Sequence, residues 1–201
     1  MYTKYLKYKI DFIFSLVFLF VLSPIIILVS IILFFTNSGN IFFIQKRIGY
    51  KHKEFNIIKF KTMRDVQIGL NETITDSQRL TKIGKIIRNY SVDEILQFIN
   101  VIKGEMSIVG PRPLLPKYMK FYSKDELLRH NLKPGITGWA QINGRNLITW
   151  KKKFQYDIEY IERASFLFDL KIIFFSFFIV LFKKGVNNKN NLITAEYNGI
   201  N

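Results

Sequence analysis

The residues of this chain best suited to chemistry are two adjacent carboxylates, Asp93 and Glu94, in the stretch SVDEILQFINVIKG. They lie in a chain of 201 residues whose 30 lysines and arginines outnumber its 15 acidic residues, which gives a net charge of +15. Such an excess indicates an anionic partner: a nucleic acid, an anionic lipid or a phosphorylated substrate. The two acids either begin a helix and nothing more, or form a centre around which the positive charge is organised.

The same stretch predicts a helix with a capped start. Ser91 and Glu94 fit a capping box, and the helix dipole favours an acid such as Asp93 in a first helical turn. An apolar stripe follows, and Gly104 suits the end of the helix. Considered alone, this pattern favours a structural role for both acids.

Composition narrows the chemistry further. The chain has no cysteine and only two histidines, His52 and His130, which excludes disulfides, thiolate zinc sites and histidine-rich metal centres. A catalytic site must therefore use carboxylates, lysines, arginines, hydroxyls or a bound ion. Since 49% of the residues are hydrophobic and 20 are phenylalanine, the positive charge points to a membrane surface rather than to an ordinary soluble nucleic-acid binder.

Residues 10–35 form an apolar run whose single charge is Asp11. As one helix this run would be ~39 Å long at 1.5 Å per residue, which is enough to cross a bilayer. Its length and the lack of a small-residue cleavage site argue against a signal peptide. Ser23-Pro24 lies in the middle, where proline must bend a helix, and lysines flank both ends. A spanning helix and a re-entrant helix, which enters and leaves by the same face, both fit these residues.

The remainder of the chain predicts a single, mainly helical α+β domain. Four segments have patterns of regular structure: a loose β-hairpin at 41–61, a basic amphipathic helix at 77–90, a helix with core spacing at 150–164 and an apolar helix at 172–182. The last of these is too short to span a bilayer, so it suits an interfacial or buried position. The Asn-rich tail from residue 185 is expected to be loosely ordered.

Two loops have sequences that suit ligand binding. Arg112 stands between two prolines in IVGPRPLLP, and a stiff loop presents an arginine to phosphate at low entropic cost; an exposed arginine in an ordinary turn is the alternative. Residues 130–145, HNLKPGITGWAQINGR, include three glycines that allow close approach to a ligand or simply make turns. They match neither a P-loop nor a dinucleotide fingerprint, so no ATP or NAD site is predicted.

Taken together and in order, these motifs resemble one protein family. The apolar run with its central Ser-Pro is followed by KFKTM, then by SVDEILQFINVIKGEMSIVGPRPLL, then by KPGITGWAQINGR. This order resembles the bacterial sugar transferase family, the small monotopic phosphoglycosyl transferases, and above all those members that initiate protein N-glycosylation. The likeness extends over nearly the whole chain.

The resemblance implies that a sugar 1-phosphate passes from a UDP-sugar to undecaprenyl phosphate, with release of UMP and with Mg²⁺ required. It implies that Asp93 is the nucleophile, that Glu94 is its partner, and that both acids hold the metal. Phosphate binding is expected from four cationic side chains: Lys59, Arg88, Arg112 and Arg145. The expected donor is UDP-N,N′-diacetylbacillosamine or a similar N-acetylated amino sugar.

Two alternatives to this activity remain open. One is a relative that uses another UDP-sugar, such as galactose or N-acetylgalactosamine, to begin a capsule or an O-antigen. The other is a basic membrane-surface scaffold without catalytic activity.

The resemblance also implies a topology and a location. Ser23-Pro24 would make the first helix re-entrant, so that residues 1–36 form the membrane anchor, 37–185 a compact catalytic domain with interfacial amphipathic helices, and 186–201 a C-terminal tail. The expected location is the cytoplasmic face of the bacterial inner membrane. The expected partners are membrane lipids and downstream glycosyltransferases, and no nucleic acid.

Overall fold

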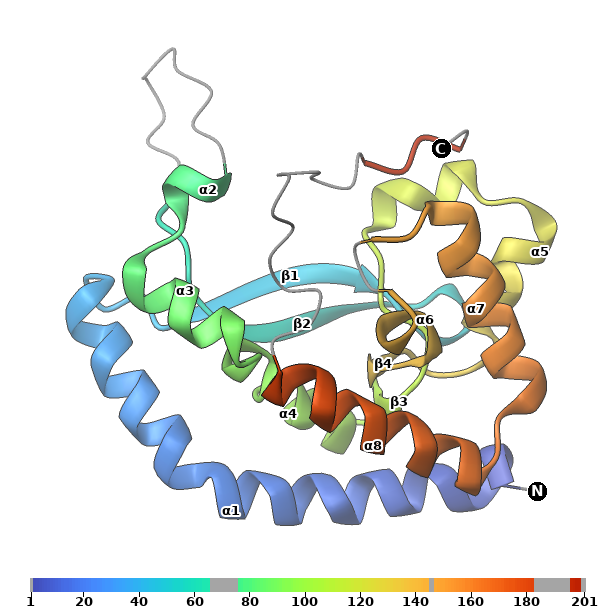
Figure 1. Ribbon diagram of the computed structural model, residues 1–201, viewed down its shortest axis with the longest axis horizontal. Helices are drawn as coiled ribbons and strands as arrows, with labels where there is room; N and C mark the ends of the chain where they lie inside the picture. Colours follow the sequence, from blue (N-terminus) through green and yellow to red (C-terminus); the bar gives the residue numbers. More distant parts are fainter. Residues whose placement is uncertain (1, 66–75, 145–146, 183–195, 200–201) are drawn as a thin grey trace.

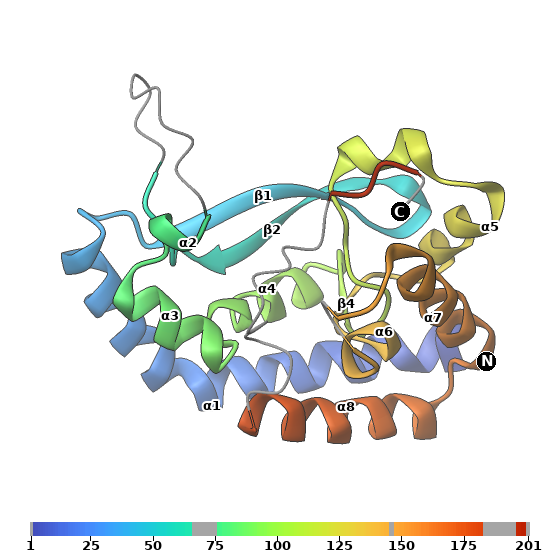
Figure 2. The ribbon, with the colours of Figure 1, turned by 45° about the horizontal axis from the view of Figure 1, so that its top comes forward.

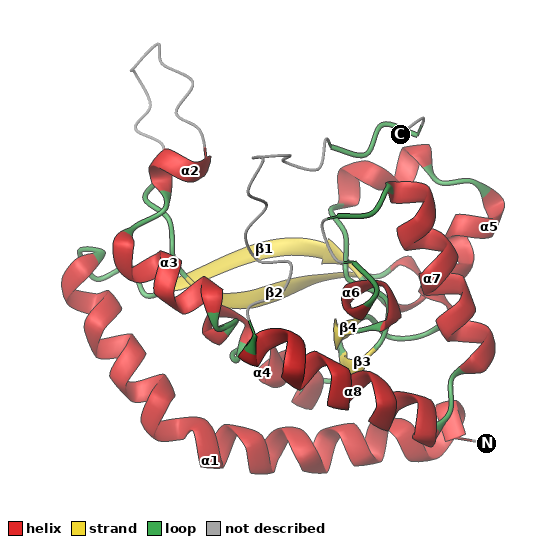
Figure 3. Cartoon of the chain, in the orientation of Figure 1, coloured by secondary structure: helices red, strands yellow, loops and turns green. Residues whose placement is uncertain are grey.

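The computed structural model describes residues 2–65, 76–144, 147–182 and 196–199. Over these ranges the chain forms the mainly helical α+β fold expected from the sequence, with two small sheets (Figure 3). The helices are α1 (Lys7–Thr36), α2 (Asp76–Arg79), α3 (Lys82–Asn89), α4 (Gln97–Ile102), α5 (Lys124–Leu127), α6 (Trp139–Ile142), α7 (Trp150–Arg163) and α8 (Phe166–Leu181). The strands are β1 (Phe42–Ile48), β2 (Glu54–Phe60), β3 (Ser107–Val109) and β4 (Gly135–Thr137), and a 3₁₀ turn, η3 (Val92–Glu94), precedes α4. The helix predicted at 150–164 is thus confirmed as α7.

Helix α1 has 30 residues and changes direction near its middle (Figure 1). Pro24 lies inside the helix and cannot donate a backbone hydrogen bond, while the Ser23 hydroxyl donates to the Phe20 carbonyl at 2.7 Å. These two features explain the bend, which the sequence predicts at Ser23-Pro24. Counted from Tyr2, this is the one helix in the described part of the chain that is long and apolar enough to cross a membrane.

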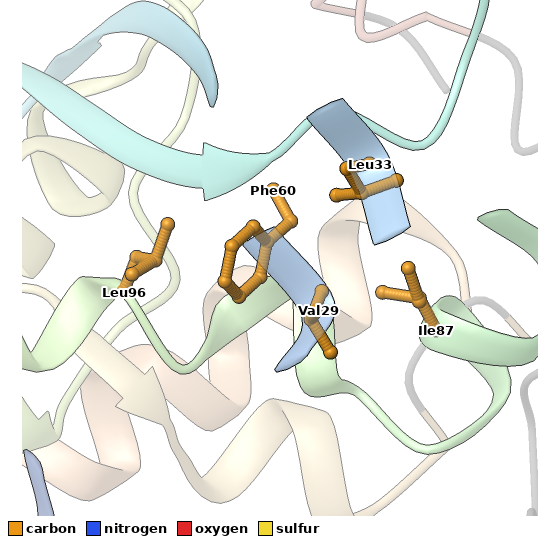
Figure 4. Packing of buried hydrophobic residues seen from close by; sticks show 5 residues of the cluster. All are labelled: Val29, Leu33, Phe60, Ile87 and Leu96. Atoms are coloured by element: carbon orange, nitrogen blue, oxygen red, sulfur yellow. The ribbon is translucent and has the colours of Figure 1, made fainter. Parts of the chain in front are cut away.

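The second half of α1 packs against the domain (Figure 4). It contributes to a buried cluster with side chains of β2, α3 and the segment before α4: Val29, Leu33, Phe60, Ile87 and Leu96. Most other apolar side chains of α1 are exposed, and so are most of those of α8. Since a soluble monomer rarely exposes so large an apolar surface, these two helices indicate association with a membrane.

Strands β1 and β2 pair antiparallel along their full length, which confirms the predicted hairpin. Asn100, which is fully buried, fastens α4 to β2: its amide donates to the Asn56 carbonyl at 2.8 Å and accepts from the Ile58 N–H at 3.2 Å. Buried hydrogen bonds of this kind fix one element against another because no water competes for them. The turn η3, which leads into α4, is therefore held next to β2.

The basic helix predicted at 77–90 is divided in two. Thr81 is extended, and its hydroxyl caps α3 by accepting from the Gly84 N–H at 2.8 Å. A Cβ atom at Gly84 would lie 2.1 Å from the carbonyl oxygen of Thr62, so only glycine lets α3 approach the end of β2 so closely. This close packing also brings Arg88, in the last turn of α3, to the end of β2.

The capping box predicted at Ser91 is wrong. Ser91 has a φ of 54°, its hydroxyl makes no hydrogen bond with the described chain, and the turn η3 follows in place of an α-helix. The left-handed conformation at Ser91 turns the chain sharply between α3 and η3. As a result the carboxylate of Glu94 can contact Lys59 of β2 and Arg112 of the Pro-Arg-Pro loop.

Helix α8 starts at Phe166, earlier than the predicted residue 172, and Ser165 caps it. Its first turn meets that of α1 in a buried polar cluster, in which Lys7 Nζ lies 2.5 Å from one carboxylate oxygen of Asp169 and 3.6 Å from Asp11. From this shared start the two helices run in the same general direction (Figures 1 and 2). The cluster thus fixes the origin of both apolar helices.

The expectation of a loosely ordered tail is wrong for residues 196–199. Tyr197 is 5% exposed, and its ring packs 5.1 Å from that of Phe154 and 5.5 Å from that of Trp150, measured between centroids. Its hydroxyl donates a hydrogen bond to the Phe121 carbonyl at 3.2 Å. Residues 186–195 lie outside the described ranges.

Candidate active site

A cavity of about 730 Å³ is lined by side chains of the hairpin, α3, η3, the Pro-Arg-Pro loop and α7. Five residues predicted to form the site line it: Lys59, Arg88, Asp93, Glu94 and Arg112. The fold therefore gathers side chains from β2, α3, η3 and the loop after β3. Arg145 lies outside the described residues, and Ser23 and Pro24 belong to α1 rather than to the wall of this cavity.

Glu94 is bound by two cations. Its Oε1 atom lies 2.7 Å from Lys59 Nζ and 3.1 Å from Arg112 Nη2. Lys59 faces Glu94 because Asn100 holds α4, which follows η3 directly, against β2. Since Glu94 and Lys59 are largely shielded from solvent, their attraction is screened less than that of a surface pair. Glu94 therefore positions two cations at the cavity wall.

Asp93, in contrast, has no such partner. It is 9% exposed, and its carboxylate makes no hydrogen bond or ion pair with the described chain. Burial and the negative charge of Glu94 raise the pKa of Asp93, and the nearby cations Lys59, Arg88 and Arg112 offset part of that rise. A buried, unpaired carboxylate among cations suits attack on, or binding to, a negatively charged electrophile such as a phosphoryl group.

Arg88 is held at the cavity by the residues that follow β2. Its Nε donates to the Thr62 hydroxyl at 2.9 Å, and its Nη2 lies 3.1 Å from the Met63 sulfur. Thr62 and Met63 are the last two residues of the motif KFKTM, so the motif supplies both a cation, Lys59, and the support for a second one. Arg88 adds positive potential near Asp93 without a direct bond to it.

Two arginines that the sequence analysis did not single out hold the Pro-Arg-Pro loop. Arg129 Nη2 donates to the Arg112 carbonyl at 2.7 Å, and Arg47 Nη1 donates to the Pro113 carbonyl at 3.2 Å. Arg129 is 3% exposed and also forms a buried ion pair with Asp157 of α7, at 2.7 Å. The loop is thus stiffened by tertiary contacts as well as by its prolines, which keeps Arg112 in place.

The sequence contains a signal for only one member of the buried Arg129–Asp157 ion pair. Asp157 falls between Phe154 and Ile161 on the apolar stripe of α7, and a carboxylate on a core-facing stripe needs a buried partner. Nothing in the sequence identifies that partner as Arg129. Two other cavity residues, Gln141 and Lys153, were also missed. Gln141 stands within KPGITGWAQINGR, but nothing in that motif singles out its amide, and Lys153 belongs to none of the quoted motifs.

The acids of the cavity fit a magnesium ion only together with a phosphorylated ligand. Within the described ranges, no three His, Cys, Asp or Glu side chains gather in one place. Asp93 and Glu94 thus provide at most two carboxylates, of which one is already shared with two cations. Mg²⁺ is commonly bound by one or two carboxylates plus substrate phosphates. The unpaired carboxylate of Asp93 fits such a site.

Comparison with known proteins gives a consistent result. A family model described as "Bacterial sugar transferase" matches residues 2–183. The "Uncharacterized sugar transferase EpsL" of Bacillus subtilis (strain 168) is 43% identical over 184 residues, which cover 91% of each chain. The UDP-glucose:undecaprenyl-phosphate glucose-1-phosphate transferase of Escherichia coli (strain K12) is 36% identical over 196 residues.

A third relative has a different sugar in its name. The UDP-N-acetylgalactosamine-undecaprenyl-phosphate N-acetylgalactosaminephosphotransferase of Aeromonas hydrophila is 30% identical over 178 residues. The matches cover 92% and 85% of this chain, but only 41% of the Escherichia coli protein and 42% of the Aeromonas protein. The chain thus spans less than half the length of these two relatives.

Proposed function

Because the chain belongs to the bacterial sugar transferase family, it is a phosphoglycosyl transferase, and we propose that it transfers a sugar 1-phosphate from a UDP-sugar to undecaprenyl phosphate with release of UMP. The names of the Escherichia coli and Aeromonas relatives support this reaction class. The observation that carries the proposal is the contrast between two neighbouring acids. Glu94 is bound by Lys59 and Arg112, whereas Asp93 has no hydrogen-bond or ion-pair partner among the described residues.

Asp93 is the nucleophile of the proposed reaction. Its carboxylate oxygen attacks the β-phosphorus of the UDP-sugar, the bond from that phosphorus to the bridging oxygen breaks, and the electron pair leaves with UMP. The resulting acyl phosphate carries the sugar. An oxygen of undecaprenyl phosphate then attacks the same phosphorus, and the Asp93 carboxylate is released.

The cations of the cavity counter the repulsion between this carboxylate and the phosphates. Arg112 of the Pro-Arg-Pro loop and Lys59 of β2 both line the cavity and are oriented by Glu94 before the substrate arrives. Groups that are fixed in advance stabilise developing charge without the cost of reorganisation. Bound Mg²⁺, held by Asp93 and Glu94 together with the diphosphate, would supply further charge neutralisation.

The donor sugar is proposed at two levels. An N-acetylated amino sugar, with N,N′-diacetylbacillosamine as the specific case and protein N-glycan assembly as the pathway, is what the resemblance to the members that initiate N-glycosylation implies. The relatives named above add glucose and N-acetylgalactosamine. A panel of these UDP-sugars, scored by UMP release, decides between them.

The proposed site of action is the cytoplasmic face of the bacterial inner membrane. Undecaprenyl phosphate keeps its tail in the bilayer, and a UDP-sugar is soluble in water, so an enzyme for both must work at the interface. The bend of α1 at Pro24 and the packing of Val29 and Leu33 on the domain support a helix that returns to its own side. The exposed apolar side chains of α8 also support a position of the enzyme at the membrane interface.

Replacement of the proposed nucleophile tests the mechanism. Asp93→Asn is expected to lower UMP release by roughly four orders of magnitude or more, since loss of a covalent nucleophile has effects of this size. Asp125→Asn, which changes an exposed acid on α5, serves as the matched control and should retain full activity. Rapidly quenched wild-type enzyme should carry one sugar phosphate on Asp93 by intact-protein mass spectrometry with peptide mapping. Full UMP release by Asp93→Asn would remove this residue from the mechanism.

The topology has its own test. The chain contains no cysteine, so single cysteines introduced at Thr3 and Tyr50 can be labelled selectively. In intact spheroplasts, a membrane-impermeant reagent should label neither position if α1 is re-entrant, and both after lysis. Labelling of one position alone in intact spheroplasts would show that α1 spans the membrane.

A further inference from the structure

The cavity extends to a second end, along α6 and α7, that the proposed chemistry leaves unused. Gln141 of α6 and Lys153 of α7 line this end, and Trp150 lies beside Lys153. Arg112 connects the two ends, because its guanidinium contacts Glu94 and its positive charge acts on Lys153. We call this part of the cavity the Lys153–Gln141 end.

Lys153 has the properties of an anion-binding residue that lacks its anion. Its ammonium makes no hydrogen bond or ion pair with the described chain and lies 4.4 Å from the centroid of the Trp150 ring. Burial and the positive charge of Arg112 lower the pKa of Lys153, and the negative charge of Asp157 opposes that shift only in part. Asp157 is already paired with Arg129. An anion between Lys153 and Arg112 would relieve the repulsion between the two cations.

Gln141 has an amide group without a hydrogen-bond partner in the described part of the chain. Both its side-chain nitrogen and its side-chain oxygen are shielded from solvent, and neither makes a hydrogen bond with the described chain. Buried polar atoms are nearly always paired, and each unpaired one costs roughly 1–3 kcal/mol. An amide offers one donor and one acceptor side by side. A ligand with the complementary edge would therefore satisfy both atoms at once.

We propose that the Lys153–Gln141 end binds the UMP half of the donor: Lys153 and Arg112 hold the α-phosphate, and the carboxamide of Gln141 pairs with the imide edge of uracil. A nucleoside monophosphate supplies both an anion and a donor–acceptor edge, whereas a sugar ring would leave Lys153 unpaired. The order along the cavity is then Asp93, β-phosphate, α-phosphate and base. When the bond from the β-phosphorus to the bridging oxygen breaks, the negative charge passes to the phosphate of UMP, next to Lys153 and Arg112.

This inference rests on the proposed function, and direct binding measurements test it separately. The full-length protein in nanodiscs is titrated calorimetrically with UMP, and with uridine by displacement. Lys153→Met should weaken UMP binding roughly ten-fold and leave uridine binding unchanged, because only UMP carries the phosphate. Gln141→Leu should weaken both ligands by a similar factor, roughly three- to ten-fold.

Two controls separate recognition from folding. Lys151→Met removes the same charge from an exposed position on α7, and Asn143→Leu removes a carboxamide that already donates to the Trp139 carbonyl. Both should bind UMP and uridine as the wild type does. Gln141→Leu should melt no lower than the wild type, because it replaces two unpaired polar atoms by apolar ones of similar shape.

Three results would overturn the inference. In the first, Lys153→Met weakens uridine as much as UMP; in the second, Gln141→Leu leaves both affinities unchanged. In the third, Gln141→Leu alters the preference between UDP-glucose and UDP-N-acetylglucosamine while UMP binds as before, which would place the sugar at this end. Wild-type protein that binds UMP as expected but releases none from any UDP-sugar would instead reject the proposed transfer and leave the UMP site intact.

Discussion

Two regions of this molecule bury charged side chains, and they treat them in opposite ways. Where α1 and α8 begin, Lys7 is fully buried and lies near two carboxylates, Asp169 and Asp11. The other oxygen of Asp169 accepts from the Tyr160 hydroxyl at 2.7 Å, and Asp11 accepts from the Ser107 hydroxyl. In the cavity, by contrast, Asp93 is buried and Lys153 is half-buried, and neither has a hydrogen-bond or ion-pair partner in the described chain.

The difference separates charges that build the fold from charges that await a ligand. A buried charge costs several kcal/mol unless it is paired and hydrogen-bonded, so a fully satisfied cluster fixes the elements that supply its members. An unsatisfied buried group lowers stability, and it is retained where a ligand supplies the missing partner. The start of α1 and α8 belongs to the first class, and the two ends of the cavity belong to the second.

The largest expected effect on stability tests the first class. Lys7→Met should lower the free energy of unfolding by about 3–5 kcal/mol, because it leaves the buried carboxylates of Asp11 and Asp169 without their cation. Denaturant unfolding in detergent micelles measures the change. Lys9→Met, an exposed neighbour on the same helix, is the control and should change stability little. Equal stability of the two variants would contradict the structural role of the cluster.

An intermediate effect on stability is expected at Asp157, where a paired buried charge supports a residue of the cavity wall. Asp157 pairs with the buried Arg129, which in turn donates to the Arg112 carbonyl. Asp157→Asn keeps a hydrogen-bond acceptor but removes the charge, so a loss of about 1.5–3 kcal/mol is expected. Because Arg112 is then held less firmly, the KM for the UDP-sugar should rise while the KM for undecaprenyl phosphate stays the same.

The control for this variant is Glu54→Gln, which breaks an exposed ion pair with Lys46 and should cost about 0–1 kcal/mol. If Asp157→Asn lowers stability but changes neither KM, Arg129 supports the fold alone and does not position Arg112.

Local patterns account for what the sequence predicts correctly. The hairpin and α7 follow from alternation and helical spacing, and the stiff loop that presents Arg112 to the cavity follows from the two prolines beside it. The gathering of Asp93 and Glu94 with Lys59 came from the resemblance to a family, since no local rule joins η3 to β2. The order of motifs therefore predicted a contact between η3 and β2 that hydrophobic periodicity cannot predict.

The failures have a common physical origin in contacts between distant residues. Lys7 and Asp169 are separated by most of the chain, and each looks like an ordinary charged residue at the start of an apolar helix. Ser91 and Glu94 have the spacing of a capping box, but the left-handed backbone at Ser91 places them otherwise. Tyr197 stands in a polar tail, and only the aromatic cluster around Trp150 explains its burial.

The smallest effect provides a sharp test of the second class, because its sign is opposite to that of Lys7→Met. Burial and the charge of Glu94 raise the pKa of Asp93 above its ordinary value of 3.8, so the folded protein holds this proton more tightly than the unfolded chain does. As pH rises from about that ordinary value through the raised pKa, ionisation of Asp93 therefore removes stability from the wild type. Asp93→Asn cannot ionise, so its stability relative to the wild type should increase over this window and stay constant above it. Unfolding measured at several pH values gives this difference. A difference that instead shrinks with rising pH would mean that the fold already satisfies the Asp93 carboxylate, and the contrast between the two regions would then not hold.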